Sequence, residues 1–140
     1  MNKIKIIGVW KKVSEKPLLE DGTIIKEPDQ WNMIKIITDK YFMFAEQSQE
    51  RLKLNKNFTD KEFHNSLLSF FGGAGTYTFD GINYIEKIEI FLNPNYIGVS
   101  IPYKCEFKNG LMIHTGIFPV QSVGLKEPDY EVCEVWERVE

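Results

Sequence analysis

Three tight-turn dipeptides constrain the fold of this chain more than any other feature of its sequence. Asp21-Gly22, Asp80-Gly81 and Asn109-Gly110 each lie between runs rich in β-branched and aromatic residues. Such dipeptides readily adopt the positive-φ turns that join adjacent antiparallel strands. Asp39-Lys40 and Asn93-Pro94-Asn95 are weaker turn signals of the same kind. The turns therefore predict a sheet built mainly of consecutive hairpins.

Eight strands are expected between these turns, and an aromatic content of 14% favours strands over a helical bundle. An up-and-down antiparallel meander of eight strands can close into a barrel, which removes both exposed edges and leaves room for one small ligand. The 140 residues suit one all-β domain spanning 1–140. The expected strands are 8–15, 31–38, 41–47, 74–80, 82–91, 99–108, 111–118 and 130–139.

The two faces of the expected strands differ from one strand to another. Strand 99–108 alternates cleanly, as a half-buried strand does, with one face made of Val99, Ile101, Tyr103, Cys105 and Phe107. Strands 31–38 and 41–47 instead carry apolar residues on both faces. We therefore expect a lid, a neighbouring segment or a second subunit, as in a homodimer, to cover part of the outer surface.

One segment interrupts the meander with a helix signal. Thr59-Asp60-Lys61-Glu62 is a capping box, and after it Phe63, Leu67 and Phe70 or Phe71 recur at helical spacing. The Gly72-Gly73 pair is then expected to stop the helix, which we place at about 60–70. Such a helix would either cover exposed sheet or act as a lid over the mouth of the barrel.

The last segment has two interpretations. Val132, Val135, Trp136 and Val139 fit helical spacing, whereas the Val, Trp and Cys content of 130–139 favours a strand. Closing the sheet also requires a strand there, but the residue pattern alone leaves both interpretations open.

Gly8-Val9-Trp10 near the start of the chain and Arg138 near its end favour the strand, because together they resemble a motif of the small bacterial lipocalin-like domains of the calycin superfamily. In that family a G-x-W in the first strand meets an Arg of the last strand at the closed end of an eight-stranded barrel. The resemblance implies that Trp10 plugs the barrel and that Arg138 covers it by a cation–π contact. It covers most of the chain except 48–72, through Gly73–Gly81, Tyr84-Ile85-Glu86, His114-Thr115-Gly116 and Glu134–Arg138.

Several kinds of partner are not expected. The formal net charge of −3, without a Lys/Arg run longer than two, argues against nucleic acid, and no apolar window is long enough for membrane insertion. Cys105 and Cys133 lack metal-ligand spacing, and strands six and eight of a meander hold them too far apart for a disulfide. We expect two reduced thiols, no metal, no cofactor and a cytoplasmic location, or a periplasmic or secreted one if a signal peptide has been removed.

The polar candidates of the barrel interior lie on four neighbouring strands: Glu86, Tyr103, His114 and Glu134. A buried carboxylate needs a partner, so Glu134 is expected to contact Arg138, His114 or a tyrosine hydroxyl. His114 suits a plain hydrogen-bonding residue, a general base or a haem ligand.

The leading hypothesis is a non-catalytic binding protein for a small, mostly hydrophobic molecule held in the barrel. One alternative is an isomerase or cyclase that uses Glu134 and His114, and another is an interaction protein whose barrel is filled by side chains. The expected ligand-binding residues are Phe42, Phe44, Tyr77, Glu86, Ile88, Ile101, Tyr103, His114, Glu134 and Trp136.

Overall fold

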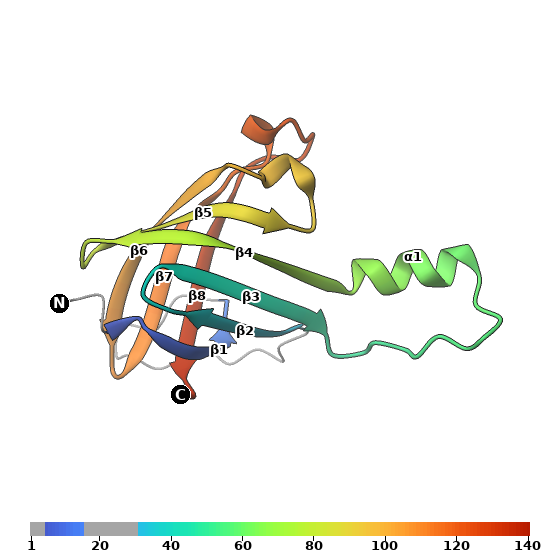
Figure 1. Ribbon diagram of the computed structural model, residues 1–140, viewed down its shortest axis with the longest axis horizontal. Helices are drawn as coiled ribbons and strands as arrows, with labels where there is room; N and C mark the ends of the chain where they lie inside the picture. The colour runs from blue at the N-terminus through green and yellow to red at the C-terminus, as the bar shows by residue number, and fades with distance from the viewer. Residues whose placement is uncertain (1–4, 16–30) are drawn as a thin grey trace.

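The chain forms a closed barrel of eight antiparallel strands in up-and-down order, as Figure 1 shows. The computed structural model describes residues 5–15 and 31–140, so the Asp21-Gly22 turn lies outside the described residues. Pairing of the first and last strands closes the sheet and confirms the predicted fold class, including a strand rather than a helix at the C-terminal end. The strands are β1 (Gly8–Ser14), β2 (Trp31–Ile37), β3 (Tyr41–Ser48), β4 (Phe70–Phe79), β5 (Asn83–Phe91), β6 (Ser100–Lys108), β7 (Leu111–Phe118) and β8 (Tyr130–Arg138).

The two ends of the barrel differ in how their strands are connected. At one end, which we call the closed end, short hairpin connections at 38–40, 80–82 and 109–110 join β2 to β3, β4 to β5 and β6 to β7. Asn109 and Gly110 both have positive φ, as the predicted tight turn requires. At the other end, the open end, longer connections carry the helix α1 (Asp60–Leu68) and the short helices η2 (Pro94–Tyr96) and η3 (Gln121–Val123).

Trp10 and Arg138 meet at the closed end. The guanidinium carbon of Arg138 lies 4.3 Å from the centroid of the Trp10 ring, and the two residues are paired across β1 and β8. The Arg138 guanidinium also donates hydrogen bonds to the carbonyls of Ile7 and Lys5. The Trp10 indole is 1% exposed and donates to the Ile6 carbonyl at 2.8 Å. This end of the barrel is therefore filled by side chains.

The Gly72-Gly73 pair does not stop the helix, which corrects the sequence-based prediction. The helix ends at Leu68 with Ser69 as its C-cap, and Phe70, Phe71 and both glycines belong to β4. A Cβ on Gly73 would lie 2.5 Å from the Phe91 ring, so the pair serves close packing between strands. The start of the helix is as predicted, with Thr59 and Glu62 forming a reciprocal capping box.

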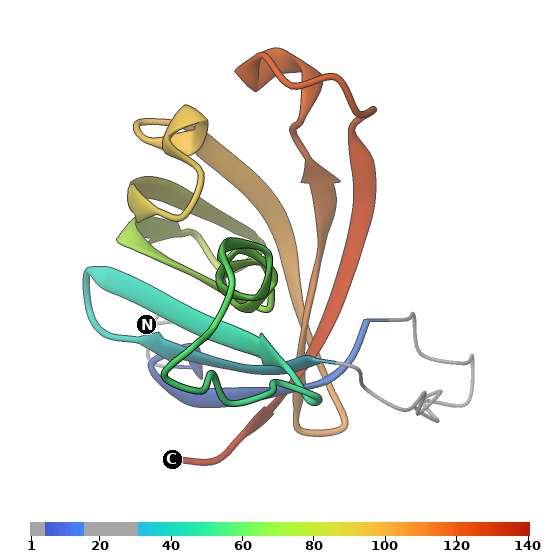
Figure 2. The same ribbon diagram turned by 90° about the vertical axis from the view of Figure 1, so that its right-hand side faces the viewer.

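The helix α1 projects away from the barrel at the open end, as Figure 1 shows, and it is seen end-on in Figure 2. None of its residues is buried, and Phe63, Leu67 and Leu68 are 46–61% exposed. In this structure α1 therefore neither covers the sheet nor lies over the mouth as a lid. Among the described residues, no helix is long and apolar enough to cross a membrane.

An apolar row crosses the outer face of four neighbouring strands. Ile36 pairs with Met43, Met43 with Ala74, and Ala74 with Ile90. Ile36, Met43 and Ile90 are 38%, 53% and 69% exposed. The apolar outer face expected from strands 31–38 and 41–47 is thus present, whereas its coverage by a second copy of the chain stays a prediction.

Candidate ligand-binding site

The open half of the barrel contains a cavity of about 300 Å³. All eight strands contribute side chains to its wall. The cavity is bounded on the closed side by a buried layer that includes Tyr84, His114 and Trp136, which are not exposed at all. The barrel is therefore not filled along its whole length by the described residues.

A buried ion pair forms the inner wall of the cavity. The ammonium of Lys35 on β2 lies 2.7 Å from a carboxylate oxygen of Glu86 on β5, and the Tyr84 hydroxyl donates to the same oxygen at 2.8 Å. Lys35 is 2% exposed and Glu86 4% exposed. Aromatic rings surround the ammonium, with its nitrogen 5.0 Å from the Trp136 ring centroid and 5.5 Å from that of Tyr84. Pairing and cation–π attraction together offset the cost of burying both charges.

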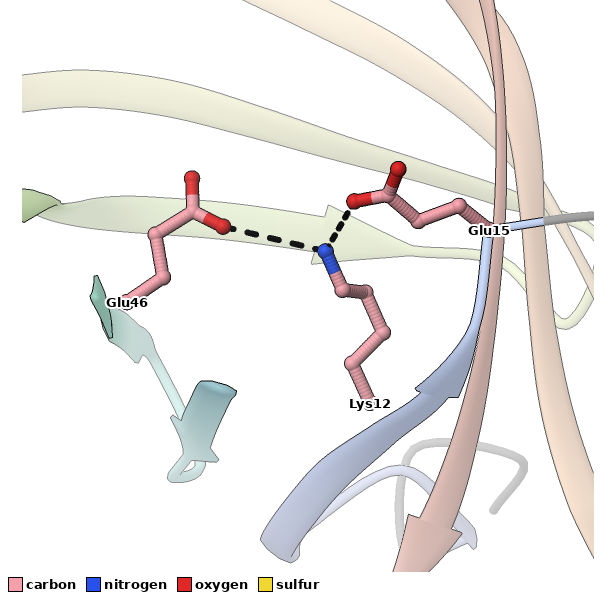
Figure 3. Close-up of polar contacts among 3 residues, drawn as sticks. All are labelled: Lys12, Glu15 and Glu46. Atoms are coloured by element: carbon pink, nitrogen blue, oxygen red, sulfur yellow. Dashed lines mark hydrogen bonds and ion pairs between the residues drawn. The ribbon is translucent and has the colours of Figure 1, made fainter. Parts of the chain in front are cut away.

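A second lysine lies between two carboxylates nearer the mouth, as Figure 3 shows. Lys12 on β1 forms an ion pair with Glu15, and its nitrogen lies 3.7 Å from a carboxylate oxygen of Glu46 on β3. Burial alone would lower the pKa of Lys12, but the carboxylates of Glu15 and Glu46 outweigh burial and raise that pKa above its usual value. Lys12 is therefore charged and already paired.

Glu134 lines the cavity without the partners that the sequence suggested. Arg138 is exposed at the closed end, where it binds backbone carbonyls. His114 is directly opposite Glu134 on β7, yet neither ring nitrogen of His114 has a hydrogen-bond partner among the described residues. Burial raises the pKa of Glu134 above its usual value, although the nearby Lys35 acts in the opposite direction. The expected pairing with Arg138, His114 or a tyrosine hydroxyl is therefore wrong, because within the described residues the hydroxyls of Tyr84, Tyr77 and Tyr96 donate elsewhere and none donates to Glu134.

Two buried rings beside Glu134 also have unpaired nitrogens. The indole N–H of Trp136 and both ring nitrogens of His114 lack hydrogen-bond partners in the described part of the chain. Burial, assisted by the charge of Lys35, holds the pKa of His114 well below its usual value, so His114 is neutral. His114 stacks on Tyr84, with ring centroids 4.6 Å apart.

A continuous row of aromatic rings lies along part of the open end of the barrel, beside the cavity, and we call it the aromatic rim. Each ring contacts the next at centroid distances of 4.9–6.0 Å, and the rings come from β3, β4, β5, η2, β7 and β8. A molecule entering beside these rings would contact apolar surface, whereas Lys12, Glu15 and Glu46 are charged groups elsewhere on the wall of the same cavity. The aromatic rim consists of Phe44, Phe71, Phe91, Tyr96, Phe118 and Tyr130.

The structure brings six of the ten expected ligand-binding residues to the cavity wall: Phe44, Glu86, Ile88, Ile101, Tyr103 and Glu134. The other four, Phe42, Tyr77, His114 and Trp136, are buried in the core below the cavity and do not line it. The Tyr77 hydroxyl donates to the Thr38 carbonyl at 2.5 Å, which fixes this ring at the closed half of the barrel.

Sequence reasoning missed both lysines of the cavity. A signal for Lys12 exists, because strict alternation from the buried Trp10 places Lys12 on the same inward face. For Lys35 the signal is ambiguous, since the apolar Ile34 and Ile36 suggest the opposite face as the buried one. Phe71, Phe91 and Phe118 were also missed, although Phe91 and Phe118 end expected strands; Phe71 fits the helical pattern of the sequence but lies in β4 instead.

Three further observations concern metal ligands, the two cysteines and the similarity of the chain to known proteins. Within residues 5–15 and 31–140, no group of three or more His, Cys, Asp or Glu side chains is arranged to hold a metal ion. Cys105 and Cys133 are both free thiols, and burial raises the pKa of Cys105 to about 12. Comparison with known proteins finds no family model that matches the chain and no curated protein similar to it.

Proposed function

We propose that this protein binds a small amphipathic molecule inside its barrel. The observation that carries the proposal is a cavity with an aromatic rim at its mouth and paired charges on its inner wall. Ligand pockets of this kind combine a mostly apolar lining with a few convergent polar groups. The apolar part of the ligand would contact Phe44, Phe71 and Phe91, and its polar part would lie near Glu86 and Glu134.

We also propose that the barrel is lipocalin-like and bacterial in origin. Support comes from the closed up-and-down topology and from the Arg138 guanidinium over the Trp10 ring at the closed end. The two free thiols suit the cytoplasmic location that we expect from the sequence. The proposal assigns no catalytic step, because binding through apolar burial needs none.

Filling the cavity is expected to weaken ligand binding. Met33 on β2 lines the cavity and is 6% exposed, so a Met33→Trp variant would place an indole in the space that a ligand needs. We expect this variant to weaken binding of the uncharged fluorescent probe N-phenylnaphthylamine by about tenfold or more, because losing about 1.4 kcal/mol of contact already has that effect. The measurement is probe fluorescence in a titration with protein.

The matched control is Ile34→Trp, which places the same indole one residue away on the opposite face of β2. Ile34 is 47% exposed and does not line the cavity, so probe affinity should stay within about twofold of the unmodified protein. Equal affinities for both variants would contradict the proposed binding site. Absence of binding to the unmodified protein by this probe and by other apolar probes would contradict the proposed function itself.

A further inference from the structure

Glu134 is a cavity carboxyl that forms no ion pair with any of the described residues, although Lys35 and Lys12 lie near enough to act on its pKa. Both lysines of the cavity already have carboxylate partners, Lys12 with Glu15 and Lys35 with Glu86. Within the described residues, by contrast, the Glu134 carboxyl forms no hydrogen bond and no ion pair, although its side chain lines the cavity. An incoming group can therefore bind Glu134 without breaking an existing contact.

The neighbourhood of Glu134 is also where buried polar groups are left unpaired. His114, directly across from Glu134 on β7, and Trp136, two residues along β8, are fully buried with unpartnered nitrogens. Buried polar groups in native proteins are nearly always satisfied, and exceptions commonly mark a site for water or a ligand. Both rings lie in the core below the cavity and do not line it, so a ligand held in the cavity would not contact them, and it is Glu134 and its charged surroundings that point to a ligand.

The charges around Glu134 favour a cationic ligand over an anionic one. The cavity wall contains five glutamates and two lysines, and both lysines are already paired. An anion would have to displace a glutamate from a lysine and would approach the remaining carboxylates, whereas a cation meets an unpaired carboxyl. The titratable and charged groups of the cavity wall around Glu134 are Lys12, Glu15, Lys35, Glu46, Glu86 and Tyr103 on other elements and Tyr130, Glu131 and Cys133 on β8 itself, and His114 lies opposite Glu134 on β7.

The barrel already holds one ammonium group by the chemistry that a cationic ligand would need. The Lys35 ammonium is held by the Glu86 carboxylate and by the rings of Trp136 and Tyr84. Glu134 offers a carboxyl in the same way, and the aromatic rim offers further ring faces. Carboxylates and aromatic faces together are a typical environment for an organic ammonium ion.

On this basis, and resting on the proposed function, we propose that the ligand is an organic ammonium ion with an apolar body. Its N–H group donates a hydrogen bond to the Glu134 carboxylate, and its apolar body lies within the aromatic rim. The chain would thereby discriminate between molecules of the same shape by the charge of their head group.

Binding of such a ligand is coupled to proton release. In the empty protein burial raises the pKa of Glu134, so this carboxyl retains its proton to a higher pH than an exposed glutamate. A neighbouring ammonium favours the carboxylate and lowers that pKa, so the proton leaves Glu134 for solvent when the ligand binds. Release is greatest between the pKa of the loaded protein and that of the empty protein, and it falls to zero at higher pH.

The test uses three probes with one carbon skeleton, namely phenylbutylamine, phenylbutanol and phenylbutyric acid. Their affinities for the unmodified full-length protein are measured by NMR titration. Proton release is measured by calorimetry in two buffers of different ionisation enthalpy, in a series between about pH 5 and pH 8. We expect the amine to bind at least about tenfold more tightly than the alcohol, because a hydrogen bond between charged groups contributes about that factor or more. The carboxylate should bind most weakly, and only the amine should release protons.

The variant Glu134→Gln is expected to remove both the preference for the amine and the proton release, while affinity for the alcohol changes by no more than about threefold. Glu137→Gln is the matched control, since Glu137 is exposed on the same strand and does not line the cavity. Retained binding of phenylbutanol shows that Glu134→Gln is folded, and proton release by the unmodified protein tests the coupling without any substitution.

The outcomes separate the ligand class from the proposed function. If the three probes bind equally, or the carboxylate binds most tightly, the ammonium proposal is wrong while binding in the barrel stands. If the amine is preferred but Glu134→Gln retains the preference, or no proton is released across the series, the assignment to Glu134 is wrong. If no probe binds and N-phenylnaphthylamine also fails to bind, the proposed function fails together with this inference.

Discussion

Replacing Lys35 with methionine is expected to lower the free energy of unfolding by about 3–5 kcal/mol, because a carboxylate then stays buried without its cation. Glu86 is 4% exposed, and within the described residues the Tyr84 hydroxyl would be its one remaining hydrogen-bond donor. Methionine matches the length and apolar stem of lysine, so the change removes the charge with little loss of packing. Urea denaturation followed by tryptophan fluorescence measures the effect.

Two further variants isolate the cause of this loss. The double variant Lys35→Met/Glu86→Leu should recover most of the stability, since replacing both members of a buried ion pair with apolar residues is often neutral. Lys87→Met, at the exposed neighbour of Glu86 on β5, should change stability by no more than about 0.5 kcal/mol. If the double variant is as unstable as Lys35→Met, the loss comes from repacking and not from an unpaired charge.

Replacing Trp10 with alanine is expected to cost about 3–5 kcal/mol of unfolding free energy, the usual range for a buried large aromatic residue. The indole is 1% exposed, donates a hydrogen bond to the Ile6 carbonyl and contacts the Phe107 ring at a centroid distance of 6.4 Å. Its removal leaves a void at the closed end and opens the interior to water. Denaturant titration of the purified variant measures the loss.

The variant Arg138→Met distinguishes the contribution of the Arg138 guanidinium to stability from that of the Trp10 indole. This substitution removes the cation–π contact of about 0.5–2 kcal/mol but retains the packing of Trp10. The carbonyls of Ile7 and Lys5 lose their donors. Because those carbonyls lie beside an exposed side chain, water can replace the lost donors at small cost. A loss from Arg138→Met as large as that from Trp10→Ala would show that closure depends on the guanidinium and not on the plug.

Most of the fold could be predicted because its short turns are encoded locally. Asp80-Gly81 and Asn109-Gly110 set two of the hairpins at the closed end, and the observed strands other than β4 begin and end within one residue of those expected. The start of β4 was missed because glycines after a helix can either end that helix or allow two strands to approach closely, and the sequence does not distinguish these roles. Only the structure reveals that a Cβ on Gly73 would lie 2.5 Å from the Phe91 ring on the neighbouring strand.

The candidate site could be predicted less well because its charges are defined by tertiary pairing. Lys35 and Glu86 are 51 residues apart in the sequence, and neither strand alone shows that a lysine faces inward. The inward direction of Lys35 becomes favourable only when β5 supplies a carboxylate across the barrel. Glu134 could be assigned to the interior from alternation and from the resemblance of the last strand, but its lack of a partner depends on side chains from several distant strands.

The projecting arm that carries α1 connects β3 to β4, two strands that are also held together by their own β-ladder. The barrel therefore does not depend on an unbroken backbone in this arm. A single proteolytic cut between residues 49 and 59 would separate β1–β3 from β4–β8 and would leave every β-ladder intact. The two fragments would still be joined by hydrogen bonds along both the β3–β4 and the β1–β8 seams. The arm is therefore a natural place to split the protein into complementing halves, or to insert a foreign peptide, without disturbing the enclosed chamber.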